Sequence, residues 1–414
     1  MESALPSSFK SGQPSSVTRS GGWRLGIPIY IYAVVFSSLC VVMGLLWDIM
    51  WHMSIGRDGL LAPPHVVIYV GAILSGLFSA YQILDLTLNK NHPGRATAVP
   101  FWGVFYGSLG AMFCVWGALA MLTSAPFDDW WHNTYGLDVQ ILTPPHTILI
   151  IGIMTVQFGA MIGVLALQNQ NRNHPYDQSL YYNARLNRLK WLFAISAALI
   201  LVMLFIMASE SMGKFESHNP MYYATAAIIL PFFLLAVGRA SLLRWPVATT
   251  AALYMLALAL PSWILQYFAA TPRLGPVLNP ITHYQSFHFP MLLVFPGLAL
   301  DWLMHRFEKP TKKKLNDWIL AGLYASVFML ILLIVQWPFG EFLLTSPYAR
   351  NGFFLSNSWT YDSSPDWAYR YAFAPWLKQS ATDFWTGFGK ALIYAIFSAR
   401  IGLLWGSWMK RVIR

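Results

Sequence analysis

Charged side chains are scarce in this sequence. Only 11% of its 414 residues are Asp, Glu, Lys or Arg, whereas 56% are hydrophobic. A soluble chain of this size needs many more charges to cover its surface. The composition therefore excludes an ordinary soluble globular protein and favours a chain that exposes apolar surface to a lipid bilayer.

Cysteine is nearly absent as well. Cys40 and Cys114 both lie inside apolar runs, so they form no cysteine-based metal motif and do not indicate a redox compartment. Residues 1–22 are rich in Ser, Pro and Gly, and we expect a disordered cytoplasmic tail there. The first apolar run lacks a small-residue cleavage site after it, which favours a retained membrane anchor over a signal peptide.

Long apolar runs are what the sequence has in abundance. About ten of them approach the roughly 20 residues that a helix needs to cross a bilayer. They lie near residues 27–47, 66–88, 100–122, 147–168, 191–210, 221–242, 246–268, 289–304, 317–337 and 388–409. We therefore predict an all-α fold, a polytopic membrane helical bundle of about ten transmembrane helices with duplicated helical hairpins.

The net charge of +10 would suit a nucleic-acid-binding protein, but its distribution is one-sided. If the N-terminus is cytoplasmic, most Lys and Arg residues fall in the inner segments. The outer segments hold only Arg57, Lys214, Arg273, Arg350, Arg370, Lys378 and Lys390. This positive-inside asymmetry predicts an integral protein of a bacterial inner or plasma membrane, with both termini cytoplasmic and no nucleic-acid partner.

A distinctive pattern of Asp, His and Pro occurs twice within residues 23–168. In the first hairpin, Asp48 and His52 are four apart and share one helix face, and Pro63-Pro64-His65 begins the next run. The second hairpin repeats this order with Asp128, His132 and Pro144-Pro145-His146. An internal duplication explains the repeated order.

Two imidazoles and one carboxylate are ligand types that suit copper, zinc or non-haem iron. Magnesium and calcium prefer oxygen ligands alone. We therefore predict that Asp48, His52 and His65 bind a metal toward the outer face, as do their counterparts in the second hairpin. Each of these residues alone has an ordinary explanation, as an interface charge or a helix start, so the prediction depends on the repetition. Whether the two copies form one site or two stays open.

Other polar side chains fall at the same outer helix ends. Asp58 and Asp138 occupy matching positions in the two hairpins, where a carboxylate can accept the ring N–H of a ligand histidine and so orient it. Further accessory candidates are Asp129, Glu210, Glu216, His218, His283 and His288. The alternative is that the outer loops simply need polar residues.

The remainder of the chain divides by composition. Residues 169–337 are predicted to form further transmembrane hairpins. Residues 338–387 form an aromatic-rich outer segment, which we expect to lie in the membrane interface or, alternatively, to cover a cavity. Residues 388–414 are predicted to be a C-terminal helix and a basic tail.

One stretch of the first hairpin resembles a known family. Its motif is Asp48-x2-Trp51-His52-x4-Arg57-Asp58-x4-Pro63-x-His65, followed by Val66-Val67-Ile68-Tyr69. It is similar to the signature of the C subunit of copper membrane monooxygenases, the group of particulate methane and ammonia monooxygenases. The resemblance implies copper as cofactor, Asp48, His52 and His65 as ligands, oxidoreductase activity and other membrane subunits as partners. The second copy lacks the arginine before Asp138 and has one more residue before its last histidine.

Two other functions remain open from the residues alone. Repeated hairpins with polar residues are common in transporters and channels, here for a metal ion or a small solute. Because the polar groups gather toward one face, this function is favoured less than metal binding at a fixed site. Histidines on different helices also permit a haem-binding or assembly subunit of a membrane complex.

Overall fold

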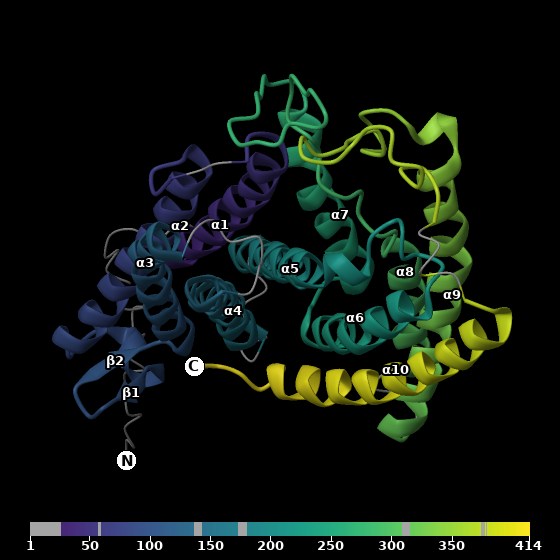
Figure 1. The fold of residues 1–414 in the computed structure, drawn as a ribbon. Coiled ribbons are helices and arrows are strands. Elements are labelled where there is room, and N and C mark those ends of the chain that lie inside the picture. The colour runs from purple at the N-terminus through teal and green to yellow at the C-terminus, as the bar shows by residue number, and fades with distance from the viewer. Residues whose placement is uncertain are drawn as a thin grey trace, which may run out of the picture.

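The computed structural model describes residues 26–56, 59–135, 143–172, 180–308, 315–373, 377 and 379–414. This part of the chain is mainly helical, with long connections between α7 and α8 and between α9 and α10 (Figure 1). Its helices are α1 (Ile29–Ser54), α2 (Pro63–Leu88), α3 (Leu109–Tyr135), α4 (Pro144–Arg172), α5 (Leu180–Ala208), α6 (Pro220–Ala240), α7 (Pro246–Leu265), α8 (Val294–Phe307), α9 (Asp317–Thr345) and α10 (Ala381–Met409). Short 3-10 turns occur at η1 (Pro93–Thr97), η2 (Ser209–Ser211) and η3 (Pro347–Ala349). The all-α prediction is confirmed.

Among the described residues, nine helices are long and apolar enough to cross a membrane. The exception is α8, whose 14 residues extend about 21 Å at 1.5 Å per residue, against a hydrocarbon core of about 30 Å. The run that the sequence places near residues 289–304 is therefore only partly helical. The run near residues 100–122 also differs, because the strands β1 (Val99–Phe101) and β2 (Phe105–Gly107) pair as a hairpin before α3 begins.

The stretch before α8 runs extended inside the protein. The Met291 N–H donates to the Tyr254 hydroxyl at 3.3 Å, and the Leu292 N–H donates to Oε1 of Gln336 at 3.1 Å. Non-helical backbone at membrane depth must find its hydrogen-bond partners within the protein, because lipid offers none. Buried polar side chains on α7 and α9 supply them, which explains why a polar residue such as Gln336 is retained in an apolar helix.

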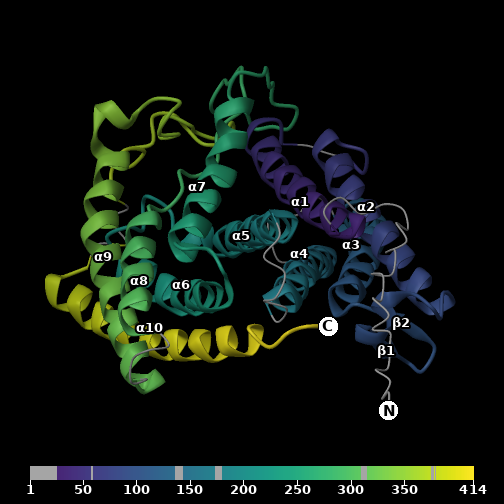
Figure 2. The same cartoon turned by 180° about the vertical axis from the view of Figure 1, so that it is seen from behind.

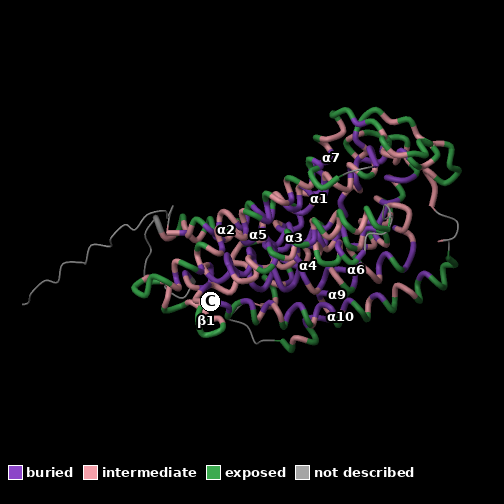
Figure 3. Tube along the Cα trace, turned by 60° about the vertical axis from the view of Figure 1, so that its left-hand side comes forward, coloured by how far each residue is buried: buried purple, intermediate pink, exposed green. Residues whose placement is uncertain are grey.

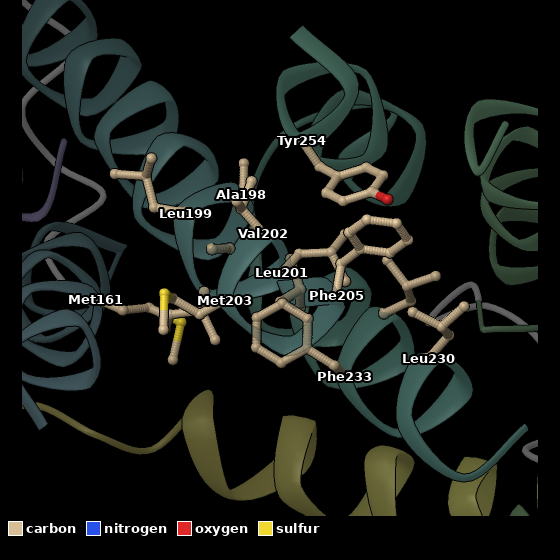
Figure 4. Close-up of a cluster of buried hydrophobic side chains, with 14 of the residues drawn as sticks. Met161, Ala198, Leu199, Leu201, Val202, Met203, Phe205, Leu230, Phe233 and Tyr254 are labelled. Atoms are coloured by element: carbon tan, nitrogen blue, oxygen red, sulfur yellow. The ribbon is translucent and has the colours of Figure 1, made fainter. Parts of the chain in front are cut away.

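Helix α5 runs through the middle of the bundle (Figures 1 and 2). Helix α4 lies on one side of it, and α6 and α7 lie on the other. Its buried side chains, such as Leu201 and Phe205, pack with Met161, Phe233 and Tyr254 from three neighbouring helices (Figure 4). Exposed residues lie on the outer helix faces and in the connections (Figure 3). Because many of these exposed residues are apolar, the bundle presents the surface expected of a protein surrounded by lipid.

The hairpins that carry the repeated motif are held by close contacts between small residues. A Cβ atom built on Gly117 of α3 would lie 2.7 Å from the carbonyl oxygen of Gly152 on α4. Between α1 and α2, a Cβ on Gly71 would lie 2.9 Å from the carbonyl oxygen of Ser37. Glycine allows such backbones to approach closely, as in other membrane helix pairs. The two helix ends that carry each motif are thereby held side by side.

Asp301 of α8 fixes the start of α7. Its Oδ1 accepts the Val247 N–H at 3.1 Å, and its Oδ2 accepts the Ala248 N–H at 2.9 Å. These N–H groups belong to the first turn of α7, which has no intrahelical acceptor for them. The buried carboxylate therefore acts as a cap supplied by a different helix.

Removal of this cap is expected to weaken the fold. Asp301→Ala leaves two buried N–H groups without acceptors, so we expect a loss of about 1–3 kcal/mol of unfolding free energy. Asp301→Asn retains one acceptor oxygen and should lose less. Thermal unfolding in detergent micelles measures both, with Arg306→Ala on the same helix as control. A midpoint for Asp301→Ala equal to that of the control would contradict the assignment.

Candidate metal centres

The first candidate centre consists of Asp48, His52 and His65. Asp48 and His52 lie in the last turns of α1, and His65 lies in the first turn of α2, which begins with two prolines. The Nε2 atom of His65 lies 3.2 Å from Oδ1 of Asp48, and Nε2 of His52 lies 3.9 Å from Oδ2. The hairpin therefore directs both imidazoles to one carboxylate, each toward a different oxygen.

The second candidate centre repeats this arrangement atom for atom. Nε2 of His146 lies 3.3 Å from Oδ1 of Asp128, and Nε2 of His132 lies 3.5 Å from Oδ2. The rings of His132 and His146 lie edge to face, with centroids 6.1 Å apart and an interplanar angle of 61°. One ligand atom from each residue falls within 4.8 Å of the others, which in the described part of the chain holds for this group alone. The second centre is thus the more tightly grouped.

Backbone carbonyls orient both rings of the first centre. Nδ1 of His52 lies 3.1 Å from the carbonyl oxygen of Gly56, and Nδ1 of His65 lies 3.0 Å from that of Gly59. Since a carbonyl oxygen only accepts, each Nδ1 carries the hydrogen. A neutral ring then directs its Nε2 lone pair toward the Asp48 carboxylate. Lone pairs that converge in this way favour a cation between them, either a proton on the ring or a metal ion.

The sequence analysis missed Gly56 and Gly59. Their contribution is a backbone oxygen, which leaves no side-chain signal. The sequence does contain one signal of a tight turn there, because Gly56 and Gly59 flank residues 57 and 58 between His52 and His65. Gly56 has a φ of +87°, a conformation that other residues rarely adopt. This φ lets the chain turn back toward His52 immediately after α1.

The connection between α7 and α8 contacts the end of α1 (Figure 1). The Gln285 N–H donates to Oγ of Ser54 at 2.7 Å, and the Arg273 N–H donates to the carbonyl oxygen of Ile55 at 2.8 Å. The acceptor residues of these two bonds, Ser54 and Ile55, lie two and three residues after His52. The position of the first centre therefore depends on a segment more than 200 residues away in sequence.

Each Asp–His contact joins two residues of the same hairpin: two contacts lie within α1–α2 and two within α3–α4. The geometry therefore supports two separate centres, one in α1–α2 and one in α3–α4. They differ in exposure, because the His52 side chain is 48% exposed and that of His132 is 22% exposed.

The accessory carboxylates are placed differently. Asp58 and Asp138 lie outside the described residues. Asp129 is exposed, and its Oδ2 accepts a hydrogen bond from the Asn133 amide at 3.3 Å. Glu210 is exposed in η2, and Glu216 lies in the connection between α5 and α6. Burial raises the pKa of Glu216. Contacts between described residues do not join the last three to either centre.

The accessory histidines also lie elsewhere. His218 stacks between Trp337 and Phe373, with ring centroids 3.8 and 4.0 Å away, and burial lowers its pKa. His283 is exposed in the connection between α7 and α8. His288, in the same connection, has its pKa lowered to about 4 by burial and then by the charge of Lys214. Across the described ranges, no contact links these three rings to Asp48 or Asp128, so their accessory role stays a prediction.

Comparisons with known proteins found no relative. No family model matches the chain, and no match was found among the curated proteins or the solved structures. The resemblance to the copper monooxygenase C subunit therefore depends on the motif of residues 48–69 and stays a prediction.

Proposed function

We propose that this membrane-spanning protein binds one transition-metal ion at each of the two centres. The observation that carries the proposal is the repeated geometry, in which each oxygen of one carboxylate faces the Nε2 atom of a different imidazole. This geometry occurs at Asp48 and again at Asp128. Two unrelated surface interactions would have no reason to share the same atoms in the same order.

The separations fit ligands of a shared cation. Two ligand atoms at about 2.1 Å from a metal, with a tetrahedral angle between them, lie about 3.4 Å apart. The Asp–His separations of the second centre are 3.3 and 3.5 Å, and the shorter one of the first centre is 3.2 Å. The carbonyls of Gly56 and Gly59 orient the rings, as hydrogen bonds to the second ring nitrogen do in metal sites generally. Metal entry would thus require little rearrangement at the second centre, whereas at the first centre His52, now 3.9 Å from Asp48, would have to approach.

Copper is the metal that we favour, with zinc and non-haem iron as alternatives. Two imidazoles and a carboxylate suit all three. The resemblance of residues 48–69 to the copper monooxygenase C subunit selects copper among them and suggests an oxidoreductase or one of its subunits. A copper ion held by three protein ligands would supply redox chemistry at positions left open for a substrate or oxygen. The chain's own part is to hold the ligands and orient the rings.

Neighbouring aspartates on α3 provide a matched test of metal binding. Asp128→Asn is expected to lower the bound metal from about two ions per chain to about one, because the remaining neutral amide neither balances the ion's charge nor bridges both imidazoles. Asp129→Asn, one position along the same helix, should leave the content unchanged. Elemental analysis of the purified protein after copper loading and desalting measures both variants.

A second measurement on the same samples separates the alternatives. Combining Asp48→Asn with Asp128→Asn should remove nearly all bound metal. Equal metal content in the wild type and in this double variant would overturn the proposal. A Soret absorption band in the purified protein would instead support the haem alternative.

A further inference from the structure

A large cavity lies on the side of the molecule away from the metal centres. Its volume is about 960 Å³, at the upper end of the range typical of ligand pockets. It is bounded by the C-terminal half of α9, the start of α10, the connection between α5 and α6, and Tyr369, Ala372, Phe373, Leu377 and Gln379 (right-hand side of Figure 1). Helices α1–α4, which carry both metal centres, lie at the left of the same view.

The walls of the cavity are mainly aromatic and aliphatic. Phe215, Trp337, Phe373 and Phe384 line it, and the ring of His218 fills the space between two of them. Nε2 of His218 bonds to the carbonyl oxygen of Trp337 at 3.1 Å, so the ring is fixed as part of the wall. Walls of this kind suit the apolar body of a ligand.

The cavity is accessible from the lipid side of the bundle. Ile334 lines the cavity on α9 and is 61% exposed, and Trp385 lines it on α10 and is 60% exposed. Leu330, one helical turn before Ile334, is 54% exposed. The apolar outer surface of α9 therefore continues into the cavity, which gives a lipid-dissolved molecule a lateral route.

None of the described residues that line the cavity is Lys or Arg, but three cations lie next to lining residues or their ring neighbours. The Arg350 guanidinium lies 3.8 Å from the centroid of the Tyr371 ring, and that of Arg370 lies 5.2 Å from the same centroid. Tyr371 directly precedes Ala372, which lines the cavity. Lys214 directly precedes the lining residue Phe215, and its Nζ donates to the carbonyl oxygen of Ser356 at 3.2 Å.

These cations have no acidic partner within the part of the chain that the structure describes. The carboxylates nearest in sequence to Arg370, Asp362 and Asp366, are exposed and form no ion pair with it. Burial, followed by the charge of Arg370, lowers the pKa of Lys214 to about 8. Cations that form no ion pair favour a ligand with an anionic group, although the carboxylates of Glu216, Glu341 and Asp383 also lie next to lining residues.

We propose that the cavity binds an anionic membrane amphiphile, with its acyl chain along the wall of Phe215, Trp337 and Phe384 and its acidic headgroup at Lys214, Arg350 and Arg370. The ligand is a constituent of the bilayer that enters past Ile334. This binding does not depend on the metal centres, and it requires no metal.

Native mass spectrometry of the full-length protein in detergent tests this assignment with two lipids of identical acyl chains. Phosphatidylglycerol is expected to bind about tenfold more tightly than phosphatidylcholine, because cations near an anionic headgroup each contribute to its binding. The double variant Arg350→Gln/Arg370→Gln should lose most of this preference. Arg273→Gln, another exposed outer arginine, should retain it.

Two further measurements distinguish binding in the cavity from binding to surface charge in general. Ala381→Trp fills part of the cavity without changing any charge, and it should weaken the binding of phosphatidylglycerol. Inorganic phosphate alone should compete poorly, because it lacks the apolar chain. The proposal is overturned if the wild type binds both lipids equally, if either the arginine variant or Ala381→Trp behaves as the wild type, or if inorganic phosphate binds as tightly as the lipid.

Discussion

Gly117→Leu is expected to lower the metal affinity of the second centre by about 100-fold while the first centre keeps its metal. Even a Cβ at this position would lie 2.7 Å from both the Gly152 carbonyl oxygen and the Val156 backbone nitrogen. Those atoms belong to the α4 backbone and cannot rotate away, so α3 and α4 must separate. Asp128 and His132 lie on α3 and His146 lies on α4, so the separation moves ligands apart.

The magnitude follows from how sensitive metal sites are to ligand placement. Changes that only disturb the orientation of a ligand already lower metal affinity by about 10–100-fold. The larger side chain should also lower stability by about 1–3 kcal/mol, as overpacking does elsewhere. Competition with a chelator of known affinity measures the metal affinity of each centre as a separate phase of the titration. Only the affinity of the second centre should fall.

Two variants control for a general loss of structure. Gly322→Leu places the same side chain on α9, where a Cβ meets no atom within 4 Å, and it should leave both phases unchanged. Gly117→Ala, the smallest change at the contact, should give an intermediate affinity. If Gly117→Leu folds and both phases match the wild type, then the α3–α4 contact does not set the ligand geometry.

Neutralising both acidic partners of Arg239 is expected to destabilise the protein by about 3–5 kcal/mol. Arg239 of α6 donates from Nε to Oε2 of Glu308 at 2.7 Å and from Nη2 to Oδ1 of Asp317 at 2.8 Å. Its Nη1 also donates to the carbonyl oxygen of Leu403 on α10, at 2.8 Å. The arginine side chain is only 7% exposed. Glu308→Gln combined with Asp317→Asn would therefore leave a buried cation without compensating charge.

Replacing Arg239 itself separates the effect of the buried charge from the effect of side-chain packing. Arg239→Met in the double-variant background removes the cation and should recover part of the lost stability, because an apolar side chain often replaces a buried ion pair with little loss. Urea unfolding in mixed micelles measures the series, with the exposed Glu341→Gln on α9 as control. Equal stability of the double variant and the control would show that these ion pairs do not stabilise the junction of α6, α9 and α10.

The sequence predicted the helices well, because a lipid-facing helix needs a long apolar run, and it predicted their ends less well. Helix α1 continues to Ser54, seven residues beyond the end of its apolar run, as the shared helix face of Asp48 and His52 requires. Before α3, a β-hairpin replaces the start of an expected helix, with Trp102 and Gly103 at positive φ in its turn. The shortness of α8 was not predictable either, because the acceptors that allow an extended stretch lie on distant helices.

For the site, spacing alone predicted which side chains approach each other. The i, i+4 relation places Asp48 beside His52, and the proline-led start of α2 brings His65 to the same end of the hairpin. The carbonyl partners of the rings were not predictable from residue types, because every residue carries a carbonyl. The sequence offered a cavity cover as the alternative for residues 338–387, and residues of this segment do line the cavity; the other walls were not predictable, since they come from segments that only the folded chain brings together.

The bonds from Gln285 and Arg273 to the end of α1 make the two centres mechanically unequal. A displacement of the α7–α8 connection, for instance by a neighbouring subunit docking on the outer surface, would pull on His52 through Ser54 and Ile55. Asp128, His132 and His146 of the second centre lie on α3 and α4, and these bonds do not involve them. The two candidate centres therefore differ in how they are attached: hydrogen bonds tie the end of α1 to a segment far away in sequence, whereas the contacts described for the second centre join α3 to α4.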